Sequence, residues 1–214
     1  METYQLRHAQ AGDARFIAAA ILTATRSHLA RGWFDIALNR SEAECLEFLT
    51  LLTTATTRSQ WHYSGFLVAE ETSCPTAALC AVRAADVYPT APMAILGTLK
   101  NMGVTQRERE LFWKRGAYLF RCTTRPDDEC LTIEVAATLS GHRRRGYTAA
   151  LLERALQDGR REGFRVAQTT CLVGNDAAQR IYERAGFRVT GELCDAEFEA
   201  ITGAPGIRSF SIAL

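Results

Sequence analysis

The chain has 214 residues, of which 47% are hydrophobic and 23% charged, and its formal net charge is +1. This length fits one domain, residues 1–214, with one sizeable core, and the composition is ordinary for a soluble globular protein. A net charge this small provides no overall attraction to nucleic acid or to an anionic membrane, so neither is expected as a partner. The sequence has no run of 18 apolar residues and no apolar signal core at its start, which favours a cytoplasmic location.

The cysteines and histidines indicate neither disulfides nor a metal site. Seven cysteines, at positions 45, 74, 80, 122, 130, 171 and 194, form an odd set without a CxxC pair. This pattern is typical of reduced, mostly buried thiols in a cytoplasmic protein. The four histidines are scattered without ligand spacing, so we expect no metal.

The first part of the chain predicts a strand followed by two helices. A short strand is expected over residues 4–9, and Asp13 is a suitable N-cap for the helix that follows. Ser41 and Glu44 form a capping-box pattern that starts a second helix. Residues 26–40, which lie between the two helices, are expected to be a loop.

Two further strands and a long insert come next. Residues 65–70 and 77–84 are short apolar segments that predict strands. The insert, residues 85–130, is too long for a simple hairpin, and a capping-box pattern at Thr105 and Glu108 predicts a helix inside it. Inserts of this length are typical of a lid, a binding surface or an oligomer contact, and we expect this one to line the acceptor side of a site.

The second half alternates strands and helices. Apolar patterning predicts helices over residues 148–159 and 175–185, and strands over residues 131–138, 165–173, 187–192 and 207–214. Strands followed by helices in this order predict an α/β (α+β) domain, in which a mixed sheet is covered by helices.

One candidate site is the loop of residues 142–148, His-Arg-Arg-Arg-Gly-Tyr-Thr. It follows a predicted strand and begins a predicted helix, whose first N–H groups and positive dipole end attract anions. Gly146 lets the backbone approach such an anion closely, and the three arginines match phosphate oxygens, so a pyrophosphate suits the loop. The alternative is a solvated basic loop with an ordinary turn at Gly146.

A second candidate motif runs from Asn175 to Phe187, Asn-Asp-Ala-Ala-Gln-Arg-Ile-Tyr-Glu-Arg-Ala-Gly-Phe. Asn175 is a good N-cap, and Ala178 and Tyr182 share one helical face. Gly186 is a typical residue to end the helix. Read as structure alone, the motif is a well-capped amphipathic helix in which Tyr182 is an ordinary core tyrosine.

Together and in this order, the two motifs resemble the acyl-CoA-binding half of the GNAT superfamily of N-acetyltransferases. Arg143 and Gly146 match the family's loop, whereas Thr148 stands where the family has Gly or Ala. In the second motif the family's Asn, Ala, Tyr and Gly-Phe positions match Asn175, Ala178, Tyr182 and residues 186–187.

The resemblance implies a GNAT-like central sheet, mixed but mostly antiparallel and flanked by helices. It implies that this sheet splays at the acyl-CoA-binding strands, that residues 131–192 form the acyl-CoA-binding half, and that a helical insert separates the third and fourth strands. It also implies acetyl-CoA as cosubstrate. The residues it assigns to acetyl-CoA binding are Ala136, Ala137, Thr138, Leu139, Arg143, Arg144, Arg145, Gly146, Tyr147, Thr148, Asn175 and Ala178.

Two catalytic residues follow from the same resemblance. Tyr182 is expected to act as general acid toward the departing CoA thiolate. Glu134, on the strand before the loop, is expected to act as the base, directly or through water, because an amine with a pKa near 10.4 is only about 0.04% neutral at pH 7. Regular strand alternation places Glu134 on one face with Thr132, Ala136 and Thr138. The alternative for Glu134 is a solvent-facing or salt-bridged side chain.

We therefore interpret the chain as an acyltransferase that moves an acetyl group from acetyl-CoA to a small-molecule or peptide amine. A homodimer fits the habit of the family. One alternative function is a catalytically silent acyl-CoA sensor. Another is a protein-interaction module that uses apolar side chains of the insert, namely Phe112, Trp113, Tyr118 and Phe120.

Overall fold

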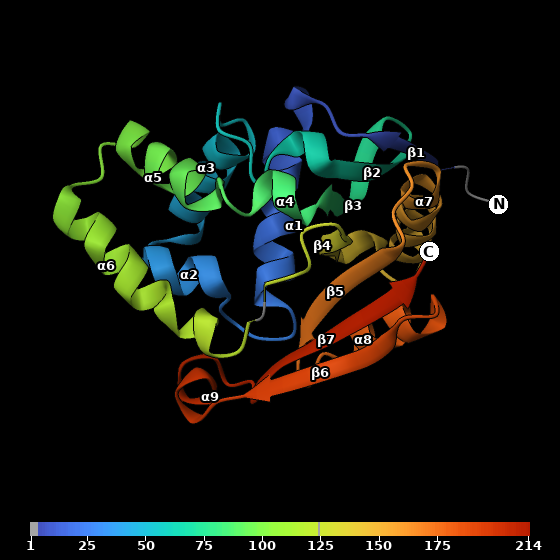
Figure 1. The fold of residues 1–214 in the computed structure, drawn as a ribbon. Helices are drawn as coiled ribbons and strands as arrows, with labels where there is room; N and C mark the ends of the chain where they lie inside the picture. Colours follow the sequence, from blue (N-terminus) through green and yellow to red (C-terminus); the bar gives the residue numbers. More distant parts are fainter. Residues whose placement is uncertain (1–3, 124) are drawn as a thin grey trace.

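A computed structural model describes residues 4–123 and 125–214 (Figure 1). Its centre is a seven-stranded sheet in the order β1-β2-β3-β4-β5-β7-β6. The strands are β1 Gln5–His8, β2 Phe66–Glu71, β3 Cys74–Arg83, β4 Leu131–Thr138, β5 Val166–Leu172, β6 Arg188–Cys194 and β7 Gly206–Ala213. Neighbouring strands are antiparallel except β4 and β5, which are parallel. This mixed, mostly antiparallel sheet confirms the predicted fold class.

Helices cover both faces of the sheet. They are α1 Ala14–Arg26, α2 Trp33–Leu38, α3 Glu42–Thr53, α4 Ala84–Val87, α5 Ala91–Asn101, α6 Gln106–Gly116, α7 Tyr147–Arg161, α8 Asp176–Arg184 and α9 Ala196–Thr202. Short 3-10 turns occupy Ala11–Asp13, Tyr63–Gly65, Ala117–Arg121 and Ser140–His142. Figure 1 shows α2, α3, α5 and α6 grouped on one side of the molecule, with α7 on the opposite side of the sheet.

Each face of the sheet has its own hydrophobic core. The first face packs against α1, α2, α3, α5 and α6, and its buried side chains include Ile17, Phe48 and Cys80. The second face packs against α7 and α8, and includes Leu152 and Leu79. Adjacent residues of β3 thus point into different cores, as the alternation of a strand requires. Each large apolar side chain buried in this way stabilises the fold by about 1.5–3 kcal/mol.

The local helix signals of the sequence are confirmed at the start of α3 and of α6. The Ser41 and Thr105 hydroxyls each accept from the backbone N–H three residues on, and the Glu44 and Glu108 carboxylates accept in return from the backbone N–H of Ser41 and Thr105. Asp13 does lie at the N-cap of α1, but its carboxylate is used elsewhere: it accepts from the Gln10 backbone N–H and from the Arg7 guanidinium.

The prediction that residues 26–40 form a loop was wrong in part, because Trp33–Leu38 is the buried helix α2. The helix begins after Gly32, whose N–H donates to the Asp35 carboxylate at 2.8 Å. Arg26 holds the same carboxylate through two hydrogen bonds, of 2.7 and 3.0 Å. A charged network therefore fixes a helix whose six residues are too few for its apolar period to stand out.

The insert belongs to the main body of the domain. It contains α4, α5 and α6, so the expected helical insert between the third and fourth strands is confirmed. Phe112 on α6 is 1% exposed within the first core, and the Trp33 indole donates to the carbonyl of Gly116 at 2.9 Å. Tyr118 is buried as well, whereas Phe120 is 71% exposed. Most of the proposed apolar partner surface therefore faces inward.

The remaining connections are tight. β2 and β3 form a hairpin whose two turn residues, Thr72 and Ser73, both have positive φ, as a twist-matched two-residue turn requires. The sequence did not reveal α9, a short helix between β6 and β7 that is capped by the Asp195 carboxylate.

All seven cysteines are free thiols, and four of them are buried. None of the helices in the described ranges has the length and apolar character needed to traverse a bilayer.

Candidate active site at the fork between β4 and β5

Strands β4 and β5 form a fork. They pair only over a short segment, from Leu131 opposite Ala167 to Ile133 opposite Thr169. The Thr169 hydroxyl closes this paired segment by donating to the Ile133 carbonyl at 2.9 Å. From Glu134 onward β4 leaves β5, so the expected splay of the sheet is present. Backbone groups along such an opening are available to an extended ligand, as at any exposed sheet edge.

A bulge in β4 lies directly at this fork. Cys80 of β3 faces Glu134 and Ala78 faces Ala137, so Val135 and Ala136 together occupy the space opposite one residue. Val135 has a φ of +43°, which is unusual for a β-branched residue. One extra residue in a strand shifts the alternation of all the residues beyond it.

The bulge overturns the expectation that Glu134 shares a face with Ala136 and Thr138. Glu134 lies opposite Cys80, a residue of the first core, whereas Ala136 packs against the second core. Thr138 lies opposite Ala77, which also belongs to the second core. Glu134 therefore does not share a face with Ala136 and Thr138, because the extra residue at the bulge reverses the alternation between them.

Glu134 is partly buried, and no salt bridge to it is found within the described ranges. The Tyr88 hydroxyl, at the end of α4, donates a hydrogen bond to its Oε1. Burial raises the pKa of the Glu134 carboxyl, and the hydrogen bond from Tyr88 partly opposes that rise. Burial and the adjacent carboxylate also raise the pKa of Tyr88 far above its ordinary value. A carboxylate with a raised pKa is better matched to proton transfer near neutral pH than an exposed one.

Tyr182 reaches the same fork from α8. Its ring packs on Phe187 and Phe210 in the second core, with centroids 5.9 and 5.6 Å away. Burial raises the pKa of Tyr182 to about 12, against a smaller lowering by a hydrogen bond with Thr169 and a further rise caused by the Glu134 charge. The ring is thus a core side chain, as one alternative held, while its hydroxyl lies at the last paired residue of β5 and stays protonated at neutral pH.

The arginine–glycine loop connects the end of β4 to α7. Gly146 precedes the helix with a φ of +85°, and a Cβ added there would meet nothing within 4 Å. The first helical N–H that finds a carbonyl partner in the described chain is that of Ala150, on Gly146. The N–H groups of the first turn of α7 are therefore free to bind an anion that approaches over Gly146.

Side chains around the loop hold its shape. The Thr148 hydroxyl lies 2.9 Å from that of Thr138, so the departure from the family's small residue ties α7 to β4. Arg145 and His142 both contact the Glu71 carboxylate of β2, at 3.2 and 3.4 Å. The Tyr147 side chain is buried in the second core, which leaves its backbone as the part available to a ligand.

Asn175 caps α8, as the sequence predicted. Its Oδ1 accepts from the Ala178 N–H at 3.2 Å, and its Nδ2 donates to the Ser27 hydroxyl at 2.6 Å. Ser27 ends α1, so the carboxamide joins the first helix of the domain to the turn after β5. Ala178 packs against the second core beside Tyr182.

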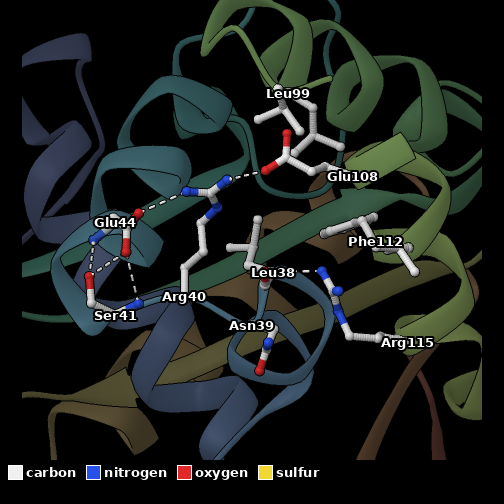
Figure 2. Close-up of a pocket in the computed structure, with 11 residues that line it drawn as sticks. Leu38, Asn39, Arg40, Ser41, Glu44, Leu99, Glu108, Phe112 and Arg115 are labelled. Carbon is white, nitrogen blue, oxygen red and sulfur yellow. Dashed lines mark hydrogen bonds and ion pairs between the residues drawn. The ribbon is translucent and has the colours of Figure 1, made fainter. Parts of the chain in front are cut away.

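Two hollows of the surface lie away from the fork. Figure 2 shows one, of about 540 Å³, between α2, α3, α5 and α6. In it Arg40 joins the carboxylates of Glu44 and Glu108, both at 2.9 Å, and thereby links the two capping boxes. The other, of about 470 Å³, lies between the first four strands and the end of α7. Neither hollow includes Glu134 or Tyr182. The fork is therefore chosen as the candidate active site because of its residues and not because of a cavity.

Comparison with solved structures supports the fold. A protein described as an acetyltransferase has a TM-score of 0.70 at 15% identity, over 96% of this chain and 97% of that one. Diaminobutyrate acetyltransferase from Paenibacillus lautus, solved with its substrate L-2,4-diaminobutyric acid and coenzyme A, has a TM-score of 0.55 at 18% identity, over 100% of this chain and 96% of that one. The putative acetyltransferase yncA from Salmonella typhimurium, solved with acetyl-CoA, has a TM-score of 0.54 at 16% identity, over 99% and 94%.

Comparison with curated protein sequences finds no match. The sequence model of the acetyltransferase (GNAT) family, in contrast, matches residues 36–187. This span runs from α2 to the residue before β6, and so includes the fork, the arginine–glycine loop and α8. The chain belongs to the GNAT family of acetyltransferases.

Proposed function

We propose that this acyltransferase moves the acetyl group of acetyl-CoA to an amine by direct attack, with Glu134 as base and Tyr182 as acid. The observation that carries the proposal is the fork, at which Glu134 and Tyr182 lie on opposite faces of the sheet and close enough for the Glu134 charge to raise the pKa of Tyr182. The amine nitrogen attacks the thioester carbonyl carbon and the carbon–sulfur bond breaks. Glu134 accepts the proton lost by the amine, and Tyr182 donates one to the departing sulfur.

The arginine–glycine loop would hold the diphosphate of acetyl-CoA. The open space over Gly146 and the free N–H groups at the start of α7 suit a phosphate that approaches the backbone closely. Arg143, whose Nε lies 3.4 Å from the Thr138 carbonyl, stands at the mouth of the fork. From there an extended pantetheine arm would follow residues 136–139 of β4 toward Glu134.

The two groups have the protonation states that the reaction needs. A base must be ionised to accept a proton, and burial brings the pKa of Glu134 up toward that of its amine partner. An acid must be protonated, which Tyr182 is at neutral pH, given a pKa of about 12. Desolvation of the departing thiolate on binding would act in the same direction, since it raises the pKa of a thiol and so favours protonation of the sulfur.

The acceptor is proposed to be a small-molecule or peptide amine. The structural relative from Paenibacillus lautus acts on a diamine, which supports an amine acceptor for this fold without identifying the one used here. The amine must lose its proton close to Glu134, so it would enter from the face that carries α1, α2 and the insert.

The test is CoA release from acetyl-CoA over a broad amine panel, with chromatographic detection because the seven thiols would react with a dye. Wild type, Tyr182→Phe and Glu134→Gln are compared. Tyr118→Phe is the control, because Tyr118 is a buried tyrosine that packs on Phe198 in a hydrophobic cluster separate from the two cores at the fork. We expect turnover with one amine class, and a fall in kcat of about 100-fold or more in both site variants, the usual contribution of a proton-transfer group. Wild-type kcat in either variant would refute the role given to that residue, and acetyl-CoA binding without turnover on any amine would favour a sensor.

A further inference from the structure

Tyr88 lies at the end of α4, a single helical turn that follows β3 without a linker. The Tyr88 N–H donates to the Ala84 carbonyl at 3.2 Å, and the next residues turn back so that the Ala91 N–H donates to the Tyr88 carbonyl at 3.3 Å. Two more backbone bonds tie α4 to the segment before β4, from Ala84 to Cys130 and from Ala85 to Asp128, at 3.4 and 3.2 Å. The tyrosine is thus fixed to the strand that carries Glu134.

The Glu134 carboxylate has few polar neighbours. Cys80 of β3 lies opposite Glu134, but the Cys80 thiol donates a hydrogen bond to the Gln60 carbonyl at 3.1 Å. On α8, the pKa of Tyr182 is raised by the charge of Glu134. At the end of α4, the Tyr88 hydroxyl donates a hydrogen bond to Glu134 Oε1. Within the described ranges, Tyr88 is the one side chain for which a hydrogen bond to this carboxylate is found, and no arginine or lysine pairs with it.

We propose that Tyr88 is the positioning residue for Glu134, holding Oε1 so that Oε2 is presented to the amine of the acceptor. This inference rests on the proposed role of Glu134 as base. A carboxylate held at one oxygen loses rotational freedom, and its free oxygen keeps one direction relative to the fork. The hydrogen bond also favours the ionised form over the protonated one, so it lowers the pH below which the base stops working.

The sign of the expected effect follows from this geometry. Tyr88→Phe keeps the ring and removes only the donor, which leaves burial unopposed and raises the pKa of Glu134. Since the base works when ionised, the acid limb of the kcat/KM profile for the amine should move to higher pH. A hydrogen bond to a charged group corresponds to a shift of about one to two pH units.

The experiment measures pH profiles of kcat/KM for wild type, Tyr88→Phe, Glu134→Gln and the control Tyr118→Phe with one amine acceptor. We expect the upward shift in Tyr88→Phe alone, an unchanged KM for acetyl-CoA, and loss of turnover in Glu134→Gln. A Tyr88→Phe profile that coincides with wild type, while Glu134→Gln is inactive, would overturn the role of Tyr88 and leave the base assignment standing. Wild-type turnover in Glu134→Gln would remove the base assignment and the positioning role together.

A second measurement does not depend on turnover. Carbon-13 NMR of the glutamate side-chain carboxyls, with Glu134→Gln to assign the signal, gives the pKa of Glu134 directly in wild type and in Tyr88→Phe. The inference requires a higher pKa in the variant. An equal pKa in the two proteins would contradict it, whatever the kinetics show.

Discussion

The glycine before α7 offers a test that separates backbone strain from ligand binding. Gly146 has a φ of +85°, and a Cβ built there meets nothing within 4 Å. Gly163, just past the other end of the same helix, has a φ of +84° and is equally open. Alanine at either position therefore introduces the same left-handed strain and no clash. What differs is that only Gly146 borders the N–H groups proposed to bind phosphate.

The two substitutions should cost similar stability. A non-glycine residue at such a φ costs about 1–2 kcal/mol, which lowers Tm by about 2–4 °C per kcal/mol in a protein of this size. Their effects on CoA binding should differ. The methyl group of Gly146→Ala would stand where the phosphate approaches, and loss of one hydrogen bond to a charged group corresponds to about a tenfold or larger rise in Kd.

Isothermal titration with CoA gives Kd, and thermal unfolding of the same samples gives Tm. We expect Gly163→Ala to keep the wild-type Kd with a lowered Tm, and Gly146→Ala to lose affinity at about the same Tm. Equal Kd values in the two variants would refute the phosphate-binding role of Gly146. A Kd raised equally in both would mean that strain in α7, rather than blocked access, controls binding.

Two further predictions concern stability. Phe112→Ala should lower the free energy of unfolding, measured in urea, by about 3–5 kcal/mol, because Phe112 is 1% exposed and contacts aromatic rings of α2 and α3. Phe120→Ala should change it little, because Phe120, in the same insert, is 71% exposed. A loss in Phe112→Ala as small as that in Phe120→Ala would show that the insert is not part of the core. Asp35→Asn should lose about 1–3 kcal/mol at pH 7. Burial alone would raise the pKa of Asp35, but the bonds from Arg26 and Gly32 outweigh it and hold the pKa below its ordinary 3.8. The stability that the ionised Asp35 contributes is therefore complete above pH 3.8 and disappears as the pH falls through the lower pKa of the folded state. The difference in unfolding free energy between Asp35→Asn and wild type should then be smaller at pH 3 than at pH 7. A difference that stays constant would contradict the assignment.

Much of the site could be predicted because its signals are local. Gly146 and Gly186 occupy the positive φ values that their places at the ends of α7 and α8 require. Asn175 caps α8 with its own side chain. Each of these features depends on residues within a few positions of one another, so the sequence pattern carries them without knowledge of the fold.

Tyr88 could not be found in this way. It is 46 residues from Glu134, and nothing in the run around it distinguishes a functional tyrosine from a residue of the insert. Its role depends on how α4 folds back along β4, which is a tertiary property. Helix α2 was missed for a related reason, since its first turn is fixed by Arg26, a residue of the preceding helix.

The bulge at Val135 had the largest consequence for the site and left no trace in the sequence, where Glu134 to Ala137 resembles an ordinary strand. A β-branched residue at φ +43° is strained by about 1–2 kcal/mol, so the surrounding structure must impose it. The bulge lies where β4 loses β5 as a partner. Glu134, before the extra residue, stays on the face of Cys80, whereas Ala136, after it, turns to the face of α7 and α8. A regular strand would have placed both residues on one face. The irregular residue therefore separates Glu134, the proposed base, from Ala136 and Thr138, which lie on the face that carries Tyr182, the proposed acid.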